Sequence, residues 1–136
     1  MEQKDYLLRE IERIGTLLRW ISGKITGIED NYALTVENQF KEAKGLLLNE
    51  IGFDTDIFLS LKESEIEQYI SKFKGINVSN IELLADIFKV FGMKTDSAMT
   101  KEYLDRALKL YELCDSFDKT FSFDRENKIN EIKNVL

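Results

Sequence analysis

The stretch "SNIELLADIFKVFG", residues 79–92, decides the fold. Its apolar side chains cover nearly the whole circumference of a helix and leave a narrow polar stripe that includes Asp86. A helix that is apolar nearly all round is buried by other elements on most sides. Ser79 and Glu82 have the spacing of a capping box, and Gly92 is typical of the left-handed residue that follows a helix. We therefore expect a buried central helix here, with Asp86 on its solvent side.

Apolar residues at helical spacing predict helices on both sides of this stretch. The expected helices cover residues 4–25, 35–49, 64–73 and 100–117, and a last one follows Ser122. The chain contains no proline, which helix interiors exclude, so its absence favours a helical protein. We expect one all-α domain over residues 1–136, with about six helices in stacked antiparallel hairpins, either tetratricopeptide-like or an irregular bundle. Phe117 and Leu136 are expected to point inward.

The first helix has a continuous apolar seam with alternating spacings of four and three. The seam consists of Leu7, Ile11, Ile14, Leu18, Ile21 and Ile25. It is typical of a helix that faces a core or a coiled-coil partner. Gly15 lies beside the seam, where glycine normally weakens a helix. A closely packed neighbour would explain it.

A second row on the first helix supplies the candidate interface residues. Arg9, Arg13, Thr16 and Trp20 are spaced four, three and four, on the face opposite the seam. A tryptophan beside arginines is typical of protein interfaces, and it also occurs on amphipathic helices that lie on anionic lipid. Three interpretations stay open: packing under another segment of the same chain, a homodimer or other protein partner, and a membrane surface.

Charge and composition exclude several classes of function. The net charge of −6 argues against a nucleic-acid binder, which needs a basic face. Residues 1–28 carry five basic and four acidic side chains, a net of +1, so the remainder carries −7. The absence of histidine and the single cysteine exclude serine–histidine and cysteine–histidine catalysis and multi-cysteine zinc sites. Charged residues interrupt the N-terminal segment, so we expect a cytoplasmic protein.

No motif predicts a catalytic, cofactor-binding or metal-binding residue. "SGKIT", residues 22–26, lacks the first glycine and the spacing of a phosphate loop. The pair Asp54 and Asp56 lacks the other ligands of a calcium loop and is expected to cap the next segment. Cys114 lies in the middle of an apolar stripe and is expected to be an inert buried thiol. Carboxylates that act as acid–base or metal groups stay an alternative.

Two stretches resemble known families. "DYLLREIERIGTLL" and "KGLLLNEIGFDTDIFLSL" are similar to a family of small, helical, uncharacterised bacterial proteins. That family has no assigned activity to transfer. "YLDRALKLYELCDSF" and the last helix resemble one unit of a tetratricopeptide repeat, without its terminal proline and small-residue positions. This resemblance implies a scaffold or interaction role.

These observations together favour a non-enzymatic protein–protein interaction or structural module that self-associates through its first helix. The alternatives are binding to a membrane surface through the same helix, and an enzyme or metal site built from carboxylates. A concave groove lined by Tyr103 or Tyr111 would instead favour peptide binding.

Overall fold

The computed structural model describes residues 2–26, 33–95 and 98–136, and within these ranges it is helical and contains no strand. The predicted all-α class is therefore confirmed. The elements in chain order are α1 (Glu2–Thr26), α2 (Ala33–Leu46), the π-helical turn η1 (Leu47–Ile51), α3 (Thr55–Ser60), α4 (Glu63–Ser71), α5 (Val78–Lys94), α6 (Thr100–Asp118) and α7 (Phe123–Val135). The described residues thus form seven α-helices instead of about six. The additional helix is α3, where Asp54 caps a segment expected to be a tight connection.

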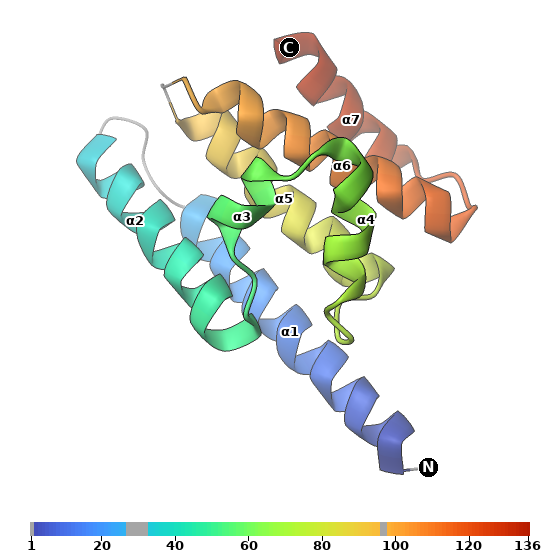
Figure 1. Cartoon of the computed structure of the whole chain (residues 1–136). Coiled ribbons are helices and arrows are strands. Elements are labelled where there is room, and N and C mark those ends of the chain that lie inside the picture. The colour runs from blue at the N-terminus through green and yellow to red at the C-terminus, as the bar shows by residue number, and fades with distance from the viewer. Residues whose placement is uncertain (1, 27–32, 96–97) are drawn as a thin grey trace.

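Helix α5 lies at the centre of the molecule, as the sequence predicts. In Figure 1, α6 runs back along α5, and α1 and the short helices α3 and α4 surround α5 on other sides. Its buried apolar residues are Ile81, Leu84, Ala85, Ile87, Phe88 and Phe91. Because α5 is apolar on most sides, it can bury side chains against α1 and α6 simultaneously.

The predicted ends of α5 are wrong. Asn77 is the N-cap, and its Oδ1 accepts a hydrogen bond of 3.0 Å from the N–H of Asn80. Ser79 therefore lies inside the helix and forms no capping box. Gly92 also lies inside α5, which continues to Lys94, and Gly92 is buried. A Cβ atom at Gly92 would lie 2.5 Å from Cδ2 of Leu104, so this glycine allows α6 to approach α5 closely.

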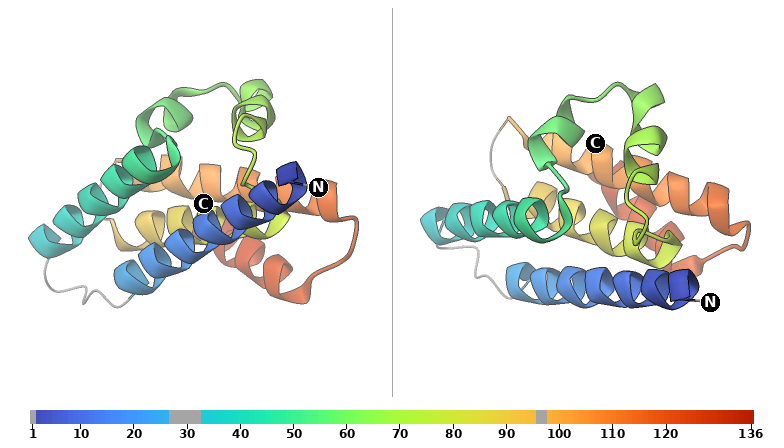
Figure 2. Two further views of the ribbon diagram at one scale, coloured as in Figure 1. Left: turned by 90° about the horizontal axis from the view of Figure 1, so that it is seen from below. Right: turned by 60° about the horizontal axis from the view of Figure 1, so that its bottom comes forward.

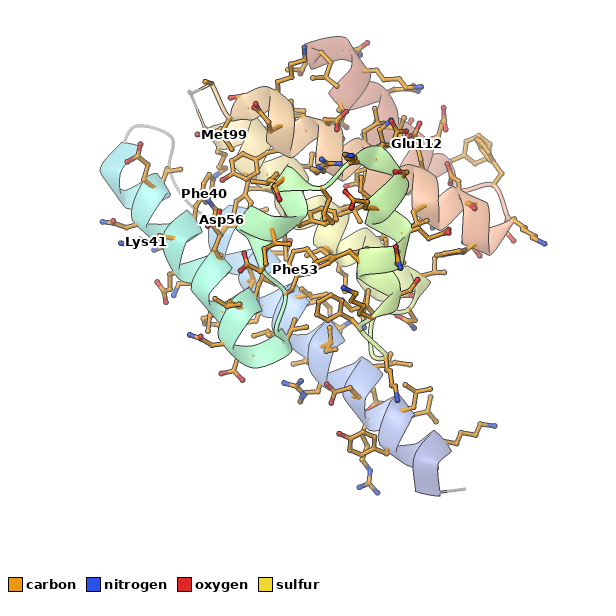
Figure 3. The ribbon with its side chains drawn as sticks, in the orientation of Figure 1. Phe40, Lys41, Phe53, Asp56, Met99 and Glu112 are labelled. Atoms are coloured by element: carbon orange, nitrogen blue, oxygen red, sulfur yellow. The ribbon has the colours of Figure 1, made fainter. Side chains whose placement is uncertain are left out.

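An aromatic cluster fills the space between α5 and the shorter elements. Phe53 follows η1 and is fully buried, and Figure 3 shows it in the middle of the molecule. Its ring centroid lies 5.2 Å from that of Phe58, 5.5 Å from Tyr69 and 6.2 Å from Phe88. Gly52 turns the chain toward this position with a φ of 83°, which confirms the predicted helix stop.

Two residues that were expected to be buried are exposed. Phe117 is 46 % exposed and Leu136 is 52 % exposed. The first turn of α5 lies beside Cys114, whose Sγ is 3.6 Å from the carbonyl oxygen of Val78. Phe117 lies almost one turn further along α6, beyond the start of α5. Leu136 likewise follows the last buried residue of α7, Ile132.

We predict that Gly92→Ala destabilises the protein by about 1–3 kcal/mol, because the added methyl group overpacks the contact with Leu104. Gly45→Ala is the matched control, since Gly45 also lies in a helix but its added Cβ meets no atom within 4 Å in the part of the chain that the structure describes. Helix propensity alone favours alanine by up to about 1 kcal/mol. Urea unfolding of both variants measures the difference, and equal stabilisation of both would contradict the close contact.

Candidate functional site: the outer face of α1

The inner face of α1 is fixed against the core. Ile14, Leu18, Ile21 and Ile25 are each at most 2 % exposed, which confirms most of the predicted seam. Gly15 is buried beside them, and a Cβ atom there would lie 3.0 Å from Oδ1 of Asn80 in α5. The close neighbour predicted from this glycine is therefore present.

Asn80 ties α1 to the rest of the protein by hydrogen bonds. Its Nδ2 donates to the carbonyl oxygen of Ile11 at 3.1 Å and to that of Gly75 at 2.7 Å. Asn80 is 2 % exposed, so leaving these groups without partners would be costly. Gly75 in turn lies so close to α1 that its Cβ would be 2.6 Å from Cδ1 of Ile14. These contacts fix which face of α1 points outward.

The predicted interface residues all lie on that outward face. We call Arg9, Arg13, Thr16 and Trp20 the α1 outer strip; all four are exposed. The Trp20 side chain is 53 % exposed. Its covered part borders a water-sized cavity between α1 and α2, lined in part by Gln39 and Leu46. The structure thus brings the four residues together on one surface and leaves about half of the tryptophan in solvent.

Ion pairs and hydrogen bonds hold the cations beside the strip. Arg13 Nη2 lies 2.7 Å from Oε1 of Glu10 and donates to the carbonyl oxygen of Glu50 at 3.1 Å. The hydrogen bond from Arg13 lowers the pKa of Glu10 below its usual value. Lys24 Nζ lies 4.9 Å from the Trp20 ring centroid, in cation–π contact. Lys24 Nζ also lies 3.0 Å from Oε1 of Glu42, so the strip presents an aromatic surface bordered by ion-paired cations.

The N-terminal part of α1 extends past the other helices (Figure 1). Tyr6, Leu7 and Leu8 are 70 %, 38 % and 51 % exposed. Leu7 belongs to the predicted seam, so the expectation of a fully buried seam is wrong at this end. Within residues 2–26, 33–95 and 98–136, no helix has the length and apolar content needed to cross a bilayer.

A separate charged network joins α7 to α5 and α6. Arg125 has a side chain only 5 % exposed and pairs with Glu82 at 2.8 Å and Asp115 at 2.9 Å. Lys128 Nζ lies 3.0 Å from Oε2 of Glu82 and 3.1 Å from Oδ1 of Asp86. Asp86 also accepts a hydrogen bond from the buried hydroxyl of Tyr111. Helix α7 thus covers part of the polar stripe of α5. The Asp86 side chain is 25 % exposed, so Asp86 lies on the solvent side as expected but is held there by an ion pair.

A groove between α2, α3 and α6 has a volume of about 400 Å³ and is bordered by Tyr103. Figure 3 shows Phe40, Asp56 and Met99 gathered around it. Lys44 lies over the Tyr103 ring at 5.2 Å. Tyr111, the other tyrosine whose place in a groove would favour peptide binding, is fully buried, and its hydroxyl belongs to the charged network. The groove carries acidic, basic and apolar groups together and selects no single class of ligand.

The other candidate groups have structural roles. Asp54 Oδ1 accepts a hydrogen bond of 3.1 Å from the N–H of Ile57, which confirms the predicted cap. Cys114 is buried as predicted, and burial raises the pKa of its thiol to about 12. Among the described residues, no three cysteine or carboxylate side chains are arranged to hold a metal ion.

Sequence reasoning missed an exposed aromatic turn between α6 and α7. Phe121 and Phe123 are 65 % and 77 % exposed, and their ring centroids are 4.7 Å apart in an edge-to-face arrangement. The signal was present in "FDKTFSF", residues 117–123, because three phenylalanines beside a helix junction cannot all face one core. This turn is a second exposed apolar surface, and it is far from α1 in the sequence.

Comparisons of this chain with protein-family models, with curated proteins and with solved structures find no match. The function proposed below therefore rests on the chain's own residues and contacts.

We predict that the stability of the protein falls in acid partly through Glu82. Burial raises the pKa of Glu82, but hydrogen bonds from Lys128 and Arg125 outweigh burial and leave the pKa below its usual value. Its stabilising effect is therefore complete at neutral pH, begins to decline near the unfolded-state pKa, about 4.3, and is lost as the pH falls through the lower folded-state pKa. Glu82→Gln removes this contribution, so its stability at neutral pH is lower and changes less with pH.

Chemical unfolding at pH 7 and pH 3.5 measures this effect, which we expect to be on the order of 1 kcal/mol. Glu67→Gln is the control, because Glu67 is exposed on α4 and lies outside the network. A pH dependence reduced equally by both substitutions would show that Glu82 has no special role.

Proposed function

We propose that this chain is a non-enzymatic, cytoplasmic protein–protein interaction module that self-associates through the α1 outer strip. The observation that carries the proposal is Trp20, a half-exposed tryptophan beside positioned cations on a helix whose opposite face is fixed in the core. Tryptophan and arginine are the residues most enriched among interface hot spots. We also propose that the chain is related to the family of small, helical bacterial proteins that its sequence resembles, which has no assigned activity.

The fixed position of α1 supports the proposal that the α1 outer strip is a docking surface. A surface that is held in place before binding loses little conformational freedom on association. Buried residues from Ile14 to Ile25 and the hydrogen bonds of Asn80 hold α1, and the pair with Glu10 holds Arg13. The strip therefore meets a partner with the helix backbone and the side chains of Arg13 and Trp20 already positioned.

The charged network supports a structural role for its carboxylates over acid–base chemistry. A general acid that works near neutral pH needs a raised pKa. The pKa of Glu82 is shifted in the opposite direction by two cations. Its partners Arg125 and Lys128 lie on α7, so these ion pairs link α7 to α5 and stabilise the fold.

We predict that the protein forms a dimer in solution and that Trp20→Ala weakens it by about 30-fold, which corresponds to a hot-spot loss of about 2 kcal/mol. Size-exclusion chromatography with light scattering over a range of concentrations measures the dissociation constant. Phe121→Ala is the matched control, because Phe121 is an exposed aromatic residue outside the strip. Unchanged helicity by circular dichroism confirms that the variants are folded.

A wild-type protein that stays monomeric at high concentration would contradict self-association. The strip can then be tested on vesicles of anionic lipid with wild type and with Arg9→Glu/Arg13→Glu. Salt-sensitive binding that the double substitution abolishes would replace this proposal with membrane-surface binding.

A further inference from the structure

The geometry of α1 points to the form of the dimer: we infer that the partner on the α1 outer strip is a second copy of this chain, with its α1 antiparallel and related by a two-fold axis between residues 14 and 15. This inference rests on the proposed self-association and adds its orientation and register. In a two-fold dimer the same surface is used by both copies, so it must be complementary to itself.

The order of residues in the strip is self-complementary in the antiparallel orientation. The spacings of four, three and four read the same in both directions, so the axis brings Arg9 opposite the partner's Trp20 and Arg13 opposite the partner's Thr16. Each tryptophan then receives an arginine, which favours cation–π contact. In the parallel orientation Arg9 would face the partner's Arg9 and Arg13 the partner's Arg13, and like charges would repel. In the antiparallel register the two Arg13 side chains alone approach each other, about 4.5 Å apart along the helix axis, and Glu10 neutralises each of them.

The charges beside the strip agree with the same register. At about 100° per residue, Glu12 and Arg19 lie on one flank of the strip, and both are exposed. The Arg19 side chain also borders a hollow beside Glu82 and Asp86 of its own chain, so it turns outward to reach a partner. The two-fold axis places Glu12 within about 3 Å, measured along the helix axis, of the partner's Arg19. The reciprocal pair forms at the other end of the interface. Opposite charges are thus paired twice, and this complementarity selects a second copy as the occupant.

The surface also has room for a second helix. Figure 2 shows α1 along one side of the molecule, with α2 and α5 on its inner side. Gly23 is exposed, and a Cβ atom built on it meets no atom of the described residues within 4 Å. In the proposed register Gly23 lies about 1.5 Å along the helix axis from the partner's Asp5, so the smallest residue lies where the N-terminal part of the partner's α1 passes.

Disulfide trapping with Asp5→Cys and Gly23→Cys tests the register without changing the strip itself. In the antiparallel dimer, position 5 lies about 1.5 Å along the helix axis from the partner's position 23. Each position is separated from its own counterpart by more than about 25 Å along that axis, which is beyond the reach of a disulfide. The native Cys114 is buried, so wild type serves as the uncrosslinked control.

The two single-cysteine proteins are incubated separately and as an equimolar mixture under mild oxidation, and covalent dimer is measured by non-reducing electrophoresis and mass spectrometry. We expect the mixture to form a covalent dimer of one Asp5→Cys and one Gly23→Cys chain, and each protein alone to form at least tenfold less. Efficient cross-linking of each protein alone would show a parallel dimer. If light scattering shows dimers but the mixed cross-link does not form, the proposed register is wrong and the proposed self-association stands. If light scattering shows monomers, both proposals are wrong.

Charge exchange gives a second, non-covalent test of the register. Glu12→Arg places arginine beside the partner's Arg19, so we expect the dissociation constant to rise at least fivefold. Glu12→Arg/Arg19→Glu restores opposite charges across the interface and returns the constant to within about twofold of wild type. Equal weakening by the single and the double substitution would contradict the pairing of these two residues.

Discussion

The hydrogen bonds of Asn80 to the backbone of Ile11 and Gly75 are the contacts on which the rest of the structure depends. They hold α1 against α5 beside Gly15, where a Cβ atom would lie 3.0 Å from Oδ1 of Asn80. Because the apolar seam is buried in that position, the rotation of α1 is set and the opposite face is outward. The candidate interface is therefore a consequence of core packing, because burial of the seam leaves the face that carries Trp20 outside the core.

Charge complementarity fixes the position of α7 against α5. The polar stripe of α5 meets a stripe of opposite charge on α7, where Arg125 and Lys128 pair with Glu82. Lys89 forms a further ion pair with Glu131. A central helix that is apolar on its remaining sides thus uses its few charged residues to select the face that α7 covers. These pairs are partly shielded from water, so removing one partner costs more than it would on an open surface.

Periodicity in the sequence was sufficient for the helical class and for most of the core. The seam from Ile14 to Ile25 and the stripe that contains Cys114 are buried as predicted, because apolar spacing reports directly on which side of a helix is covered. The ends of α5 were mispredicted because local capping signals at Ser79 and Gly92 compete with tertiary contacts. Asn77 supplies the actual cap, and Gly92 serves the packing of Leu104.

The site could be predicted only in part. The spacing of Arg9, Arg13, Thr16 and Trp20 placed them on one face, and the structure shows all four exposed. Helical spacing alone does not say how far neighbouring elements extend, so it could not show the projection of α1 past the other helices. For the same reason, the coverage of Asp86 by α7 was missed. Matching the order of charges on α5 with that on α7 would have indicated the contact.

The most direct test of the central claim is the fluorescence emission of Trp20 as a function of protein concentration. Trp20 is the sole tryptophan and is half-exposed in one copy of the chain, so its emission reports on whether a second copy covers it. We predict that the emission maximum of Trp20 shifts to shorter wavelength as the protein concentration rises. The midpoint of this shift should equal the midpoint of the increase in mass measured by light scattering. An emission maximum that stays constant while the mass doubles would show that the dimer forms through another surface and would contradict the account.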